Sequence, residues 1–82
     1  MITLSDYEYD HLIANIDRYI VIAREMGYES VLLDLYNLAF ESKISFQKHT
    51  CADLMMFVLA LLRDAGYTFS NADGDPVIEI EL

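Results

Sequence analysis

The first third of the chain repeats apolar positions with the period of an α-helix. Spacings of three and four residues place these positions on one stripe of a helix. The stripe consists of Tyr9, Leu12, Ile13, Ile16, Tyr19, Ile20, Ala23 and Met26. Ser5 and Glu8 form a capping-box signature before it, and Gly27 is the residue type that ends helices in a left-handed turn. The pattern predicts a helix from residue 6 to about residue 26.

A second helix is predicted over residues 29–41. Its buried side would consist of Val31, Leu32, Leu35, Leu38 and Ala39. Residues 42–49 allow two interpretations. Positions 43–47 alternate like a short strand, but they also fit a loop that tucks Ile44 and Phe46 under the helices. We favour the loop.

The third predicted helix, residues 51–65, contains nine consecutive apolar residues from Leu54 to Leu62, and Gly66 follows as its stop. A helix that is apolar all round is normally buried all round. Two explanations stay open. The rest of the chain surrounds this helix, or one of its faces is shared with another protein or with a second copy, which would make the protein a homodimer. The self-associating face would then contain Met55, Met56 and Leu59.

The C-terminal part of the chain changes to a period of two. Residues 67–69 and 77–82 alternate, and residues 71–76 between them are rich in turn-forming types. A β-hairpin is expected, with Ile78, Ile80 and Leu82 facing the helices. Residues 1–4 could add a short third strand. The predicted fold class is α+β: a three-helix core followed by a C-terminal hairpin, in a single domain of residues 1–82.

The order helix, helix, helix, hairpin, with the step Gly66–Tyr67 before the hairpin, resembles a winged helix-turn-helix domain. The resemblance implies that the third helix would present polar and basic residues to the major groove. Here that helix offers mainly leucine, methionine, phenylalanine and valine. We therefore expect a winged-helix-like outline without direct nucleic-acid binding.

The net charge of −9, from fourteen acidic and five basic residues, narrows the class of partner. Binding to nucleic-acid phosphates or to an anionic membrane needs clustered Lys and Arg. An acidic protein instead attracts a basic protein partner. The start of the chain lacks the features of a signal peptide, and nine apolar residues are fewer than the roughly 20 that span a bilayer. We expect a cytoplasmic protein, or one acting in the host cytoplasm if it is viral.

Acidic and tyrosine residues supply the candidate contacts. Tyrosine is enriched at protein interfaces, and Tyr7 and His11 share a helix face that the main stripe does not bury. Acids open the first helix and close the chain, and they would form one surface if the hairpin lay beside the start of that helix. The candidate partner-binding residues are Tyr7, Asp10, His11, Asp73, Asp75, Glu79 and Glu81.

Cysteine, zinc and calcium chemistry are the remaining candidates. Cys51 follows His49 at a predicted helix start, which is an environment that can activate a thiol. The alternative is a small buried cysteine. His11, His49 and Cys51 fall short of the four paired ligands of structural zinc sites. A calcium loop around Gly74 would need a glutamate where the chain has Ile80. We expect no cofactor, no metal and no enzymatic activity.

These observations favour a small acidic, non-catalytic protein-binding module. Small inhibitors of basic, nucleic-acid-handling proteins have this size and charge, as do anti-defence proteins of phages and other mobile elements, antitoxins and immunity proteins. One alternative is a structural or assembly protein that dimerises through helix 51–65. A second alternative is an enzyme that uses Cys51.

Overall fold

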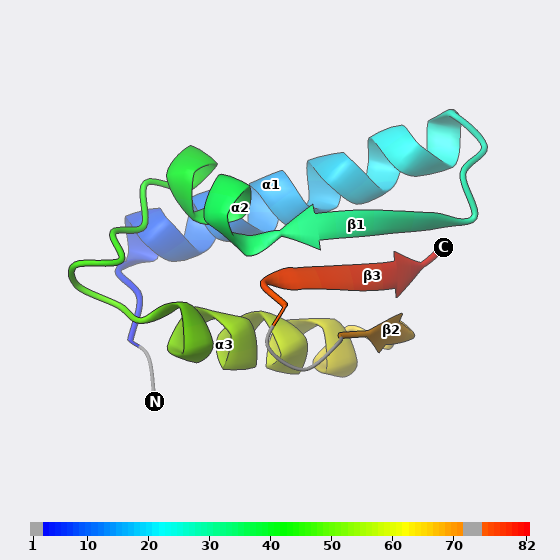
Figure 1. The fold of residues 1–82 in the computed structure, drawn as a ribbon. Helices are drawn as coiled ribbons and strands as arrows, with labels where there is room; N and C mark the ends of the chain where they lie inside the picture. The colour runs from blue at the N-terminus through cyan, green and yellow to red at the C-terminus, as the bar shows by residue number, and fades with distance from the viewer. Residues whose placement is uncertain (1–2, 72–74) are drawn as a thin grey trace.

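Three helices and a three-stranded antiparallel sheet enclose one hydrophobic core (Figure 1). The computed structural model describes residues 3–71 and 75–82. The elements are α1 (Asp6–Glu25), β1 (Ser30–Asp34), α2 (Leu35–Glu41), α3 (Cys51–Asp64), β2 (Phe69–Ser70) and β3 (Val77–Glu81). The predicted α+β class with its three helices and C-terminal hairpin is confirmed. None of the described helices is long and apolar enough to cross a membrane.

Helix α1 begins and ends where the sequence predicts. The Ser5 amide donates to Glu8 Oε1 (2.9 Å), and the Glu8 amide donates to Ser5 Oγ (3.1 Å), so both halves of the capping box are present. Gly27 follows with φ of 81°, a left-handed conformation that costs glycine little. The helix buries Leu12 and Ile20 against the rest of the core.

The predicted second helix is wrong over its first half, where the chain forms β1. Leu33 is 1% exposed while its neighbour Leu32 is 63% exposed, so burial alternates with the period of a strand. Asp34 then caps the separate seven-residue helix α2, because its Oδ1 accepts from the Tyr36 amide (2.9 Å). Leu32, expected on the buried side of a helix, faces outward instead.

The third strand of the sheet is β1, where the sequence had suggested residues 1–4. The sheet order is β1-β3-β2, so β3 is central and pairs with both neighbours. Residues 3 and 4 form no strand, and residues 1 and 2 lie outside the described part of the chain. Ile78 and Ile80 face the core as predicted, and Leu82 is half-buried.

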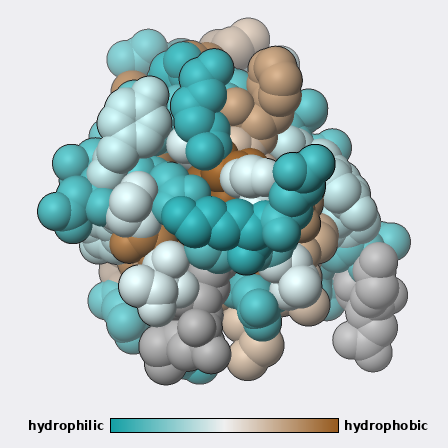
Figure 2. Space-filling model, turned by 90° about the vertical axis from the view of Figure 1, so that its left-hand side faces the viewer, coloured by the Kyte–Doolittle hydropathy of each residue, from teal (hydrophilic) through white to brown (hydrophobic). Residues whose placement is uncertain are grey.

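Residues 42–50 connect α2 to α3 without a strand, which agrees with the favoured loop. Ile44 is buried, while Phe46 stays at the surface and meets the Tyr36 ring edge-on, with centroids 5.4 Å apart. This loop and the start of α1 lie at the end of the molecule seen in Figure 2, where hydrophilic atoms dominate and hydrophobic ones show between them.

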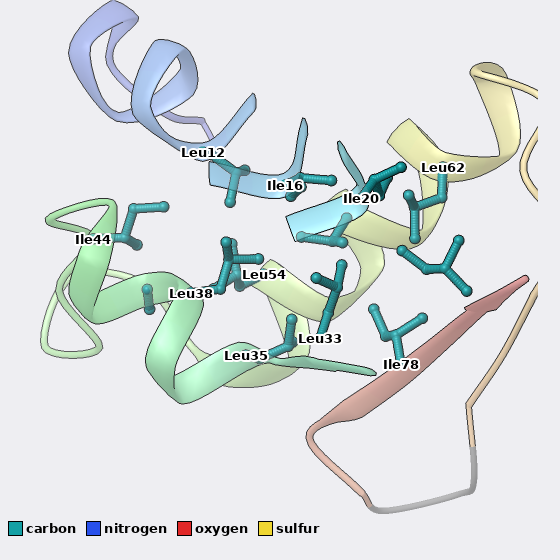
Figure 3. Packing of buried hydrophobic residues seen from close by; sticks show 13 residues of the cluster. Leu12, Ile16, Ile20, Leu33, Leu35, Leu38, Ile44, Leu54, Leu62 and Ile78 are labelled. Carbon is teal, nitrogen blue, oxygen red and sulfur yellow. The ribbon is translucent and has the colours of Figure 1, made fainter. Parts of the chain in front are cut away.

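Helix α3 buries one side only. Leu54, Val58 and Leu62 are buried in the core cluster. Figure 3 shows Leu54 and Leu62 pointing into that core. Met56, on the opposite side, is 70% exposed. The described residues of one chain bury or half-bury the apolar run except at Met56, so the first explanation holds for most of the run and fails at that position.

Candidate functional site

An apolar groove runs between α1 and the C-terminal half of α3. Its volume is about 430 Å³. Its walls are formed by Tyr9, Ile13, Ile16, Asp17 and Ile20 of α1, by Leu61, Leu62, Asp64 and Ala65 at the end of α3, and by Tyr67. The Tyr9 and Phe57 rings bridge the two helices edge-to-face, with centroids 6.2 Å apart. A groove of this size and lining is typical of a binding site.

The charged side chains that line the groove are acidic. Asp17 and Asp64 are the charged residues among the described ones that line it. Asp10 lies seven residues before Asp17 on α1 and is exposed on the same side of the helix. At one end of the groove the Arg24 guanidinium sits over the Tyr67 ring, 5.8 Å from its centroid. The groove therefore favours an apolar segment that carries basic groups at its edges.

The sequence pattern placed these apolar residues in the core. Tyr9 and Ile13 belong to the stripe predicted as buried, yet they are 42% and 37% exposed. Buried positions of α1 repeat mainly at spacings of four, from Leu12 through Ile16 to Ile20. The stripe is wider than the core can cover, and its uncovered flank forms one wall of the groove. An excess of apolar width is the signal that could have revealed it.

Tyr7 and His11 share a face of α1 outside the main stripe, as predicted, and this face is not the groove side. The two rings stack with centroids 4.0 Å apart, and His11 Nδ1 lies 2.8 Å from the Tyr7 carbonyl oxygen. Tyr7 is exposed and His11 half-buried. Of the three candidates on this helix, only Asp10 lies on the groove side.

The structure does not bring the hairpin acids to the start of α1. Glu79 and Glu81 are exposed on the outer face of β3, opposite Leu32 and Ser30 of β1. The Leu82 amide donates to the Glu29 carbonyl (3.0 Å), which places this end of β3 beside the chain that leaves α1 at its C-terminus. Asp75 is exposed before β3, and Asp73 lies outside the described residues. The single acidic surface expected from the sequence is therefore divided between separate faces.

The three candidate self-association residues of α3 differ in exposure. Met55 and Leu59 are half-buried and pack against the core, whereas Met56 is largely exposed. The uncovered face of α3 is thus centred on Met56. Its helical neighbours there are Asp53, Ala60 and Arg63, at spacings of three, four and seven residues.

Cys51 and His49 face different surroundings. Cys51 is half-buried and packs against the core. His49 Nε2 lies 3.6 Å from Glu8 Oε2. No hydrogen bond joins the cysteine to the histidine within the described residues. Among the described residues, His49 is therefore not placed as a base for the thiol, which nucleophilic catalysis would require.

The described residues also hold no group of three or more His, Cys, Asp or Glu side chains arranged to bind a metal ion. Of the candidate zinc ligands, His11 Nδ1 lies against the Tyr7 carbonyl oxygen and His49 Nε2 faces Glu8. The calcium-loop candidate around Gly74 falls on residues that lie partly outside the described ones.

Comparison with known proteins supplies no relative. No family model, no curated protein and no solved structure matches the chain.

Proposed function

We propose that this protein is a non-catalytic protein-binding module that holds an apolar segment with basic flanks in the groove between α1 and α3. The observation that carries the proposal is the groove itself: about 430 Å³ of mainly apolar space with Asp17 and Asp64 in its walls. Apolar burial would supply affinity, and the carboxylates would select basic partners and speed their approach.

The charge of the whole chain supports the same kind of partner. At a net charge of −9, the protein attracts basic surfaces at long range and repels nucleic acid and anionic lipid. A basic, nucleic-acid-handling protein is the partner class we infer. Binding would inhibit that protein, as anti-defence proteins, antitoxins and immunity proteins do with their targets.

The test is affinity capture of the tagged protein from its native lysate at low salt, followed by a high-salt wash and mass spectrometry. We expect a basic partner that salt releases. The double variant Asp17→Lys/Asp64→Lys should weaken its binding about tenfold or more. The matched control is Glu79→Lys/Glu81→Lys, which makes the same change of charge on the outer face of the sheet.

Each result has a defined meaning. Loss of the partner in the groove variant alone supports the proposal. Loss in the sheet variant alone would move the binding surface to the hairpin acids. Equal losses would mean that only net charge matters and that the groove is not the site.

A further inference from the structure

The uncovered face of α3 carries a charge pattern that is complementary to itself. Asp53 stands at its start and Arg63 near its end, ten residues and therefore about 15 Å apart along the helix. Met56 and Ala60 lie between them on the same face. All four positions are symmetric about residue 58: the outer pair has opposite charges, and the inner pair combines a large side chain with a small one.

We propose that a second copy of the chain covers this face, with the two α3 helices packed antiparallel about a two-fold axis near residue 58. Asp53 of each copy then meets Arg63 of the other, and Met56 of each copy lies over Ala60 of the other. This surface is separate from the groove, so the proposal goes beyond the function proposed above.

The charges of Asp53 and Arg63 favour a second copy of the chain as the partner, and they favour its antiparallel orientation. A parallel pair would set Asp53 against Asp53 and Arg63 against Arg63, which is repulsive. The antiparallel pair forms two opposite-charge contacts and also opposes the helix dipoles. A two-fold interface must be complementary to itself, and this face meets that condition. Among the described residues, neither Asp53 nor Arg63 takes part in an ion pair within the chain.

Size limits the strength of the dimer. Stable interfaces bury about 800 Å² per partner, whereas α3 has fourteen residues, about 21 Å of length. The dimer should therefore depend on concentration. Met56, at the centre of this face, is 70% exposed, so the described residues leave room for a partner there.

The experiment is sedimentation equilibrium from about 10 μM to about 1 mM, a range that covers weak association. The wild-type mass should rise from 9.4 kDa toward twice that value. Asp53→Arg alone and Arg63→Asp alone should each abolish the rise, because each creates two like-charge contacts. The double variant Asp53→Arg/Arg63→Asp should restore it.

The double variant separates this geometry from simple damage to the helix. Both single changes oppose the helix dipole, so destabilisation alone would make the double variant the worst of the three. Met56→Glu should also abolish association while leaving circular dichroism unchanged, and Val21→Glu, an exposed apolar position of α1, should not. A wild-type chain that stays monomeric at about 1 mM, or a double variant that fails to recover, would overturn the proposal.

Discussion

The imidazole of His49 lies against the carboxylate of Glu8, with Nε2 3.6 Å from Oε2, and both side chains are about nine-tenths buried. The same carboxylate accepts from the Ser5 amide at 2.9 Å. Glu8 thus caps α1 with one oxygen and faces the loop before α3 with the other. The distance is too long for a hydrogen bond, and Nε2 of His49 has no other partner within the described residues. One acidic side chain therefore connects the starts of two helices.

Glu8 should make the stability of the protein depend on pH. The hydrogen bond from the Ser5 amide, followed by the Ser5 hydroxyl and the charges of Lys48 and His49, lowers the pKa of Glu8, although desolvation opposes the shift. Because the folded-state pKa lies below the unfolded value, this contribution is complete above about pH 4.5 and is lost as the pH falls through the folded-state pKa. Glu8→Gln should lower the free energy of unfolding by about 0.5–1 kcal/mol at pH 7.

Urea unfolding of both proteins between pH 7 and pH 3 measures this effect. The difference between them should shrink below about pH 4.5, because protonated Glu8 and glutamine carry the same charge. Glu25→Gln is the matched control, an exposed acid in the last turn of α1, and it should not destabilise the protein at any pH. A Glu8→Gln difference that stays constant down to pH 3 would contradict a role for the charge.

Two neighbouring apolar residues of α3 should differ widely in their effect on stability. Leu54→Ala should cost about 2–5 kcal/mol, because Leu54 is fully buried and its removal leaves a cavity. Met56→Ala should cost no more than about 0.5 kcal/mol, since Met56 lies at the surface. Urea unfolding at low protein concentration checks both values. Equal losses would mean that α3 is covered on every side in solution.

Local signals in the sequence predicted α1 and α3 well. The Ser5–Glu8 box sits at the start of α1, and Gly27 and Gly66 follow the two helices with positive φ. Such signals act within one turn and need no knowledge of the rest of the fold. Strand β1 has no such local signal. The consecutive apolar residues before Leu35 fit a helical stripe as well as a strand. Its partner strand, β3, is distant in sequence. Only the tertiary structure therefore decides whether residues 30–34 form a strand or a helix.

The sequence predicted helices and strands better than it predicted which residues come together on one exposed surface. The apolar run of α3 was recognised, but its exposed centre, Met56, could be identified only once the core was assembled. Glu79 and Glu81 were correctly expected to face outward, yet their distance from the start of α1 depends on the direction of β3. The groove was missed because the pattern does not show how far apart two helices lie.

Amide hydrogen exchange would test β1 directly. The Leu82 amide donates to the Glu29 carbonyl, and the Leu35 amide donates to the Pro76 carbonyl. Bonded pairs alternate along an antiparallel ladder, so Val31 and Leu33 bond to β3 while Leu32 points its amide to the open edge. We expect exchange at Leu33 to be at least about tenfold slower than at Leu32. Similar protection at both would contradict the strand pairing, because only one of two neighbouring amides of an edge strand faces its partner.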